Sequence, residues 1–373
     1  MQFRDLKAQY EALKPEIDAG IQDVINNTSF ILGKQVTELE NKLAEYVGVK
    51  HCVGCANGTD ALQLALMIWG IGKGDAVFTT DFTYFASAGT SSILGATPVF
   101  VDIDLRTFNM SPESLEKAIQ KTIAEGKLTP KVIVPVDLFG QPADYPKIEA
   151  IAKKYGLKIL EDGAQGFGGN INGKRACSFG DMATTSFFPA KPLGCYGDGG
   201  AIFTNDDEID ARLRSLRAQG KSPVDKYDNR EIGMNSRLDT LQAAILLPKF
   251  KAFAEYELEA VNKVAAWYTE RLGDKFVTPY VPEGFYSSWA QYTLLLDSTE
   301  QRNELQAKLK AKGIPSMVYY PRGLHQQEAY KDMKLSDEDY PNTMEATKRV
   351  LSLPMHPYLD EETVDFIAKT ILE

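Results

Sequence analysis

The sequence predicts an α/β protein with a mostly parallel sheet, followed by a smaller α+β domain. Between residues 51 and 204, short β-rich runs alternate with amphipathic helical patterns. Strands that alternate with helices at this spacing are typical of a parallel sheet covered on both faces. After residue 206 the alternation stops and a long helical pattern follows. We therefore expect a large domain over residues 1–250 and a small domain over residues 251–373.

Each element rests on its own pattern of apolar residues and turn signals. The predicted strands of the large domain are 51–55, 76–79, 98–103, 132–138, 157–160, 182–187 and 200–204. The predicted helices before residue 206 are 10–26, 36–47, 59–69, 84–94, 111–119 and 145–155. Asn172-Gly173 predicts a type I′ hairpin turn. Ser111 and Pro112 predict a capped helix start.

The C-terminal part mixes helices with a few strands. After a helix at 206–219 and a polar loop at 220–234, we expect one long helix over 238–272, which leads from the large domain into the small one. The small domain is predicted to contain strands at 289–296 and 314–320 and helices at 299–312, 342–351 and 361–372.

Composition narrows the class of protein. The 373 residues carry a net charge of −10, which argues against a general nucleic-acid surface. No apolar run approaches the ~20 residues of a membrane span, and the N-terminal residues do not resemble a signal peptide. We expect a cytoplasmic protein that binds neither nucleic acid nor membrane.

The four cysteines include one C-x-x-C pair, Cys52 and Cys55. A zinc ribbon needs a second close pair, and Cys177 and Cys195 are too far apart to supply one. In a strand, Cys52 and Cys55 would point to opposite faces. Buried, reduced thiols are the favoured interpretation, and we expect no metal site.

One lysine occupies a constrained loop. Lys191 lies between Pro189 and Pro192, and a glycine-rich run at 194–200 follows. Prolines fix φ and glycines permit close backbone approach, so the loop would hold the amine at one place. A buried lysine has a lowered pKa and can act as a Schiff-base nucleophile. The alternative is a structural loop with an incidental lysine.

Three further stretches lie at predicted strand-to-helix junctions. Gly58-Thr59 opens a helix, where free N–H groups and a hydroxyl bind phosphate, unless the pair is a plain helix cap. Glu161 and Asp162 end a strand, so one acid would face a ligand and its neighbour would point away; a surface pair is the alternative. Tyr84 would lie over a planar ring or pack in the core.

Together these features describe a site for pyridoxal phosphate. They supply an amine for the aldehyde, a carboxylate for the pyridinium nitrogen, an aromatic face for the ring and a cradle for the phosphate. The carboxylate keeps the ring nitrogen protonated, so that the ring accepts electrons when a proton leaves the substrate carbon. We therefore expect pyridoxal 5′-phosphate, with its pyridoxamine form, as the cofactor.

The same motifs resemble those of the DegT/DnrJ/StrS family of sugar aminotransferases, which have the aspartate aminotransferase (type I) fold. The resemblance covers nearly the whole chain. It rests on Asn57-Gly58-Thr59-Asp60-Ala61-Leu62, Glu161-Asp162-Gly163-Ala164-Gln165, Ser186-Phe187-Phe188-Pro189-Ala190-Lys191 and Gly197-Asp198-Gly199-Gly200. It implies that Lys191 forms the Schiff base, that Asp162 contacts the pyridinium nitrogen, that Gln165 contacts the ring hydroxyl and that Tyr84 stacks on the ring.

The resemblance also implies how the phosphate is held. Gly58, Thr59 and Ser186 would bind it from the same chain. The segment 233–239 looks like the one that enters the active site of a second subunit, where Asn235 would bind the partner's phosphate. A homodimer with shared active sites follows from this implication.

The sequence departs from the family pattern in two places. Gly163 stands where the family usually has alanine, and Gly166 follows Gln165. We expect glycine there to loosen the backbone under the cofactor. Some relatives carry histidine in place of the lysine and dehydrate their substrate, and Lys191 argues against that activity.

Three stretches are similar to a narrower branch of the family: 194–200, 235–242 and 352–359. That branch transfers the amine of glutamate to C3 of UDP-2-acetamido-2-deoxy-3-oxo-glucuronic acid, for bacterial O-antigen. Arg237 would contact the sugar carboxylate, or form an interface salt bridge. Tyr319 and Tyr320 would contact sugar or nucleotide, or pack in the core. The branch usually has His-Tyr-Pro where this chain has Tyr319-Tyr320-Pro321, so His325 is the substitute candidate for the carboxylate contact.

The expected reaction is a ping-pong transfer in which the amine of Lys191 moves the proton in both halves. The alternatives are a sister aminotransferase that acts on a dTDP-linked 3-keto or a UDP-linked 4-keto sugar, and a non-catalytic regulator that binds pyridoxal phosphate. An intact lysine, acid and phosphate cradle argue against the regulator, because a scaffold needs no proton shuttle.

Overall fold

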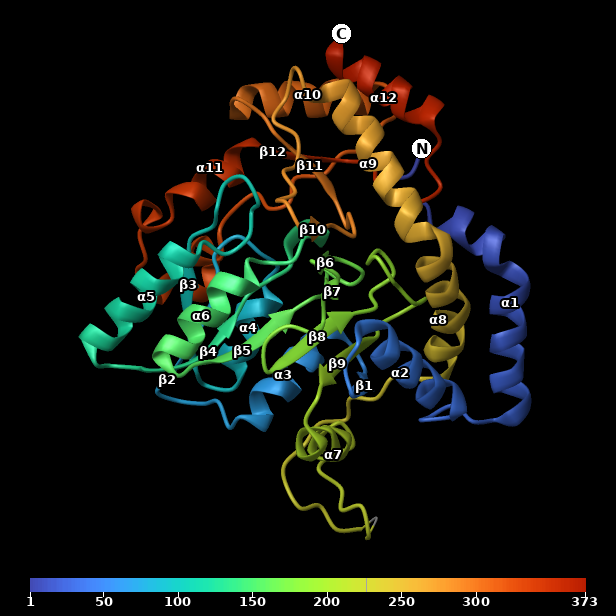
Figure 1. Ribbon diagram of the computed structural model, residues 1–373, viewed down its shortest axis with the longest axis vertical. Coiled ribbons are helices and arrows are strands. Elements are labelled where there is room, and N and C mark those ends of the chain that lie inside the picture. The colour runs from blue at the N-terminus through green and yellow to red at the C-terminus, as the bar shows by residue number, and fades with distance from the viewer. Residues whose placement is uncertain (226) are drawn as a thin grey trace.

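The computed structural model describes residues 1–225 and 227–373, and a seven-stranded sheet forms its centre (Figure 1). The strand order is β1-β9-β8-β5-β4-β2-β3. All neighbours are parallel except β9, which is antiparallel to both β1 and β8. The strands are β1 (His51–Cys55), β2 (Asp75–Thr80), β3 (Thr97–Val101), β4 (Thr129–Val134), β5 (Lys158–Asp162), β8 (Met182–Ser186) and β9 (Gly200–Thr204). The predicted mostly parallel sheet is confirmed.

Helices cover both faces of this sheet. One face packs against α2 (Lys34–Val47), α5 (Pro112–Glu125), α6 (Tyr145–Tyr155) and α8 (Thr240–Ala252). The other face packs against α3 (Gly58–Ile68) and α7 (Asp207–Leu216), with α4 (Ala86–Ile93) beside α3.

The cysteines of β1 mark these two faces. Cys52 belongs to the apolar cluster under α2 and α8, and Cys55 belongs to the cluster under α3. This opposite placement confirms the period-2 prediction. All four cysteines are buried and free.

Local chemistry explains several element boundaries. The Ser111 hydroxyl accepts a hydrogen bond from the N–H of Ser114 at 3.1 Å, and Pro112 opens α5 as predicted. Asn172 and Gly173 have φ angles of 49° and 84°, which fits the type I′ turn between β6 (Asn170–Ile171) and β7 (Lys174–Arg175). The sequence did not indicate the third strand of this small sheet, β10 (Phe285–Tyr286), which pairs with β6 and is only two residues long.

A long helical segment joins the two parts of the molecule. It comprises α8, a π turn at Phe253–Glu257 and α9 (Leu258–Leu272), where the sequence predicted one helix over 238–272. The expected domain boundary at residue 250 falls near the end of α8. Residues 261–371 contribute a separate buried apolar cluster, but the division at residue 250 stays a prediction.

The C-terminal part contains a two-stranded antiparallel sheet, β11 (Tyr292–Leu295) with β12 (Val350–Leu353). Around it lie α10 (Thr299–Ala311), α11 (Pro341–Arg349) and α12 (Glu361–Leu372). Two predictions are wrong here. Residues 350–351 belong to β12 and not to a helix. Residues 314–320 form only an isolated bridge, Met317 with Ser352, and Pro315 and Pro321 supply no N–H for a longer ladder.

The N-terminal segment lies against this C-terminal part (Figure 1). The N–H of Met355 donates to the carbonyl of Phe3 at 3.1 Å. The helix α1 (Leu6–Asn27) then runs along α8. None of the helices in the described ranges is both long and apolar enough to cross a membrane.

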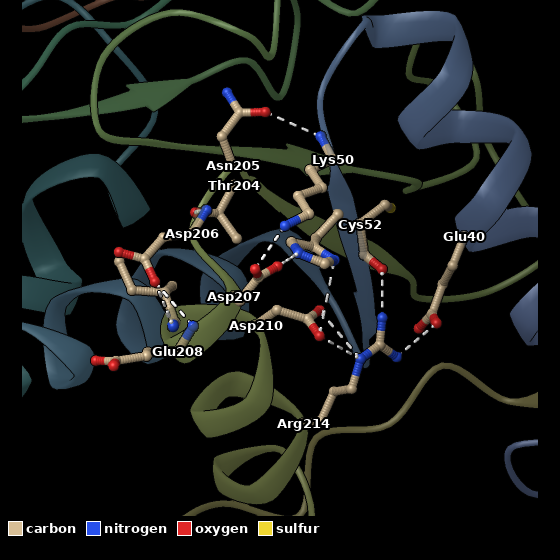
Figure 2. A network of polar contacts seen from close by, with 12 residues as sticks. Glu40, Lys50, Cys52, Thr204, Asn205, Asp206, Asp207, Glu208, Asp210 and Arg214 are labelled. Atoms are coloured by element: carbon tan, nitrogen blue, oxygen red, sulfur yellow. Dashed lines mark hydrogen bonds and ion pairs between the residues drawn. The ribbon is translucent and has the colours of Figure 1, made fainter.

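A network of ionic contacts holds α2, β1 and α7 together (Figure 2). Arg214 contacts Glu40 at 2.8 Å and Asp210 at 3.0 Å, and it donates to the carbonyl of Cys52 at 3.1 Å. Arg217 contacts the second oxygen of Glu40 at 2.6 Å. We call these residues the α2–α7 network; they join a helix on one face of the sheet to a helix on the other.

Candidate active site

A cavity of about 730 Å³ opens where the carboxyl ends of β5 and β8 meet the start of α3 and the C-terminal part of the chain. Ligands bind at this end of the strands in open α/β sheets. Nine of the residues singled out in the sequence lie on its wall: Gly58, Thr59, Tyr84, Asp162, Gln165, Ser186, Lys191, Tyr319 and Tyr320.

The lysine loop is held by its own backbone. The N–H of Lys191 donates to the carbonyl of Phe188 at 2.9 Å, and the N–H of Cys195 donates to the carbonyl of Phe187 at 2.8 Å. A Cβ at Gly194 would lie 2.5 Å from the carbonyl oxygen of Pro189, so the loop closes only with glycine there. Burial lowers the pKa of Lys191, while the nearby Asp162 acts in the opposite direction. The loop therefore presents an amine that loses its proton more readily than an exposed lysine does.

The buried carboxylate of Asp162 faces the cavity. It accepts hydrogen bonds from the Ser87 hydroxyl at 2.7 Å and from the N–H of Ala164 at 3.2 Å. Burial raises the pKa of Asp162, and Ser87, Ala164 and Lys191 each counteract this effect. Its neighbour Glu161 points away and accepts from the N–H of Phe179 at 2.7 Å. One acid of the pair therefore faces the cavity while its neighbour points away, and contact of Asp162 with a ligand stays a prediction.

The start of α3 forms a tight cradle with the ends of β8 and β9. A Cβ at Gly58 would lie 2.7 Å from the Cβ of Ser186, and a Cβ at Gly200 would lie 2.5 Å from the carbonyl carbon of Asn57. The Asn57 side chain accepts from the N–H of Asp60 at 2.8 Å. The cradle places the helix N-terminus beside two hydroxyls, those of Thr59 and Ser186, and this combination fits a phosphate group.

Gln165 and Tyr320 are oriented by hydrogen bonds. The Gln165 side-chain oxygen accepts from the N–H of Phe139 at 2.9 Å, and its nitrogen donates to the Tyr320 hydroxyl at 3.2 Å. Tyr84 is 61% exposed, so its ring is available to a ligand and is not part of the core. Phe3 contacts Tyr319 at a ring distance of 6.2 Å.

The structure does not bring Asn235, Arg237 and His325 to this cavity. Asn235 is exposed and forms an isolated β-bridge with Ala218. Arg237 is half-buried and does not line the cavity. The His325 ring lies 2.6 Å from Asp81 and 2.9 Å from Asp337, so both of its nitrogens are already engaged.

His325 therefore has a different role from the predicted carboxylate contact. The N–H of Leu324 and that of His325 both donate to Asp81, at 2.8 Å each, so His325 clamps the turn at 323–326 to the end of β2. Burial opposes a charged ring, but Asp81 and Asp337 outweigh it and raise the pKa of His325.

The two unusual glycines are explained by packing. A Cβ at Gly163 would lie 2.6 Å from the sulfur of Cys177, and a Cβ at Gly166 would lie 2.3 Å from the Cβ of Asp137. The expected loosening of the backbone is thus not what the structure indicates. Glycine is needed because neighbouring side chains fill the space.

Several cavity residues were not recognised in the sequence. Ser87 orients Asp162, and Asp198, Gln291 and Arg322 lie on the wall. Asp198 lies within Gly197-Asp198-Gly199-Gly200, one of the motifs that carry the resemblance. The signal for Ser87 was its place near the start of a helix, three residues after Tyr84. Nothing in the sequence pattern singled out Gln291 or Arg322.

Comparison with known proteins identifies the family. The profile of the DegT/DnrJ/EryC1/StrS aminotransferase family matches residues 11–372. A UDP-2-acetamido-2-deoxy-3-oxo-D-glucuronate aminotransferase of Pseudomonas aeruginosa is 49% identical over 372 residues, covering 100% of this chain and 99% of that protein. A pleiotropic regulatory protein of Geobacillus stearothermophilus is 46% identical over 374 residues, covering 99% and 97%.

A solved structure agrees with this result. The crystal structure of a DegT DnrJ EryC1 StrS aminotransferase from Brucella abortus has a TM-score of 0.96 and 49% identity to this chain, and covers 100% of this chain and 98% of that one. The predicted fold class is confirmed. The extent of these matches shows that the chain belongs to the DegT/DnrJ/EryC1/StrS aminotransferase family.

Proposed function

We propose that this protein is a pyridoxal phosphate-dependent aminotransferase that moves the amino group of glutamate to C3 of a UDP-linked 3-keto sugar, UDP-2-acetamido-2-deoxy-3-oxo-glucuronic acid. The observation that carries the proposal is the meeting of Lys191, Asp162 and the Gly58–Ser186 cradle in one cavity. The choice of sugar is supported by the Pseudomonas aeruginosa relative, which is named for this substrate.

The wall residues fit each part of the cofactor. The N-terminus of α3 with Thr59 and Ser186 would hold the phosphate, and Asp162 would contact the ring nitrogen. Tyr84 would cover the ring face and Gln165 would contact the ring hydroxyl. When bound, the cofactor supplies a ring that accepts the electron pair left by a departing proton.

Lys191 performs the proton transfers. Lys191 would hold the cofactor through its nitrogen until glutamate binds, and its freed amine would then take the proton from the α-carbon of glutamate. The cofactor would supply the carrier that keeps the amino group when 2-oxoglutarate leaves. In the second half, the same Lys191 amine would deliver a proton to C3 of the sugar. Its lowered pKa suits this work because a general base must be unprotonated near neutral pH.

A homodimer would complete the site. Asn235 and Arg237 lie off the wall of their own cavity, and Asn235 is exposed, so both are available to a second chain. We propose that Asn235 binds the partner's phosphate and that Arg237 contacts the carboxylate of the partner's sugar. We further propose a cytoplasmic location and a role in the synthesis of O-antigen sugars of lipopolysaccharide.

A panel of nucleotide keto-sugars tests the proposal. The purified protein is incubated with pyridoxal phosphate, glutamate and either the UDP-3-keto uronate, a dTDP-3-keto sugar or a UDP-4-keto sugar. We expect 2-oxoglutarate and an amino sugar, detected by mass spectrometry, with the uronate as the best acceptor. A better dTDP-linked or 4-keto acceptor would replace the proposed substrate. Absence of transfer to every sugar would favour a regulator, a role suggested by the name of the Geobacillus relative.

A further inference from the structure

An arginine that does not line the cavity forms a hydrogen bond with the lysine loop. The Arg4 side chain donates from Nη2 to the carbonyl oxygen of Pro192, the residue directly after Lys191, at 3.2 Å. Burial lowers the pKa of Arg4 to about 10, and Glu257 opposes this effect. The guanidinium therefore remains charged at neutral pH.

The chain on both sides of Arg4 is anchored. The carbonyl of Phe3 accepts from the N–H of Met355. The side chain of Asp5 accepts from the N–H of Ala8 at 2.9 Å and caps α1. One turn later, Gln9 donates to both carboxylate oxygens of Glu257, at 2.9 and 3.0 Å. Arg4 therefore projects from a fixed segment, and its position is set by the fold.

Besides Lys191, the titratable groups that interact with Arg4 are Glu257, Lys249 and His356. Glu257 is already held by Gln9 and by the hydroxyl of Tyr358 at 2.7 Å. Lys249 is buried near Tyr196 with no hydrogen-bond partner among the described residues, and burial lowers its pKa to about 8. The charges that act on Lys191 are Asp162 from β5 and Arg4 from the N-terminal segment, with Asp198 on the same cavity wall.

We propose that Arg4 is a positioning residue for Lys191. Its hydrogen bond to Pro192 fixes the loop, and its positive charge disfavours a proton on the nitrogen that Lys191 presents to the cavity. The Lys191 nitrogen is then available as nucleophile and base at a lower pH than without Arg4. The inference rests on the proposed function only in so far as the nitrogen is joined to a cofactor.

Three substitutions separate charge from hydrogen bonding. Arg4→Lys keeps the charge, Arg4→Gln keeps a donor without the charge, and Arg4→Met removes both. Lys7→Gln is the matched control, because it removes an exposed cation from the same segment. The main readout is the pH midpoint of the visible absorbance of the cofactor joined to Lys191 in the holoenzyme.

We expect Arg4→Gln and Arg4→Met to raise this midpoint, because loss of a nearby positive charge stabilises the protonated form. Arg4→Lys and Lys7→Gln should keep the wild-type midpoint. We also expect kcat at neutral pH to fall in Arg4→Gln while KM for glutamate changes little. A wild-type midpoint in Arg4→Gln would overturn the proposal. This holds even if all three Arg4 variants melt at a lower temperature than the wild type, because lower stability alone would indicate a merely structural role.

A second readout does not depend on the proposed function. In the full chain without cofactor, the pH dependence of Lys191 acetylation is followed by mass spectrometry of its peptide. The same upward shift in Arg4→Gln supports the inference even if the holoenzyme transfers no amine to any sugar. An unshifted profile together with normal amine transfer refutes the role of Arg4 and leaves the proposed function intact.

Discussion

The α2–α7 network and the cavity both contain buried charged groups. In the network these groups form ion pairs with each other, whereas among the described residues of the cavity wall they do not. In the network, Glu40 and Arg217 are 4% and 5% exposed, and they contact each other at 2.6 Å. Arg214 occupies the second oxygen of Glu40 (Figure 2). In the cavity, the side chain of Asp162 accepts hydrogen bonds from Ser87 and Ala164, and Lys191 lies in a site where burial lowers its pKa.

This difference separates a structural role from the catalytic role that we propose for Lys191. Breaking a buried ion pair by removing one partner destabilises the fold, because it leaves an uncompensated buried charge. A buried amine held by a loop backbone, with its pKa shifted by its surroundings, is suited to chemistry. Substitutions in the two regions should therefore affect different quantities: stability in the network and turnover in the cavity.

The largest effect is expected for Lys191→Ala. Loss of the amine removes both the attachment of the cofactor and the proton transfer, so kcat should fall by at least about 10⁴-fold, or about 5.4 kcal/mol. The visible absorbance of the cofactor joined to Lys191 should disappear, while the melting temperature should stay close to that of the wild type. Stopped assays of 2-oxoglutarate and absorbance spectra measure both effects.

Lys153→Ala is the matched control for this change, because it removes an exposed lysine from α6. It should keep the wild-type rate and spectrum. Turnover of Lys191→Ala at the wild-type rate would contradict the assignment of Lys191.

The second effect concerns the network. Glu40→Gln leaves Arg217 buried without its partner charge, so the free energy of unfolding should fall by about 3–5 kcal/mol. Urea denaturation followed by circular dichroism measures this loss. The kcat of the protein that is still folded at low temperature should remain unchanged, because Glu40 does not line the cavity.

Glu38→Gln on the same helix is the matched control. Glu38 is exposed and contacts Lys42 at 3.7 Å, an interaction worth about 0.3–0.5 kcal/mol. Equal destabilisation by the two substitutions would show that burial of the ion pair does not determine the loss in free energy of unfolding. A drop in kcat for Glu40→Gln would remove the distinction between the network and the cavity.

The sequence predicted those features that depend on local pattern. The alternation of strands and helices led to the sheet, and the proline and glycine residues around Lys191 led to the constrained amine. Asn172-Gly173 predicted its turn because only a few residue types accept two positive φ angles. Asp162 followed from its place after an apolar strand, since strand ends gather at one edge of the sheet.

Features that depend on distant contacts were missed. His325 looked like a ligand contact, but Asp81, far away in the sequence, engages its ring. Arg4 received no role because only the folded chain brings it to Pro192. The segment 314–320 has the residues of a strand, yet only Met317 finds a bridging partner. Such contacts cannot be read from periodicity, which reports local geometry alone.

The smallest effect tests the cradle without touching any charge. In Gly58→Ala, the new methyl group would lie 2.7 Å from the Cβ of Ser186, so the start of α3 must shift away from β8. Overpacking of this kind costs about 1–3 kcal/mol. We expect most of this cost to appear as weaker binding of pyridoxal phosphate, measured by fluorescence titration of the cofactor-free chain, because alanine favours the helix itself.

Gly72→Ala is the control, since its Cβ would meet only the carbonyl of Leu94 at an ordinary 3.6 Å, away from the cavity. Unchanged cofactor affinity in Gly58→Ala would mean that the phosphate does not lie between α3 and Ser186. Lost affinity with retained stability would show that an uncharged part of the cavity, unlike the α2–α7 network, contributes to ligand binding and not to the stability of the fold.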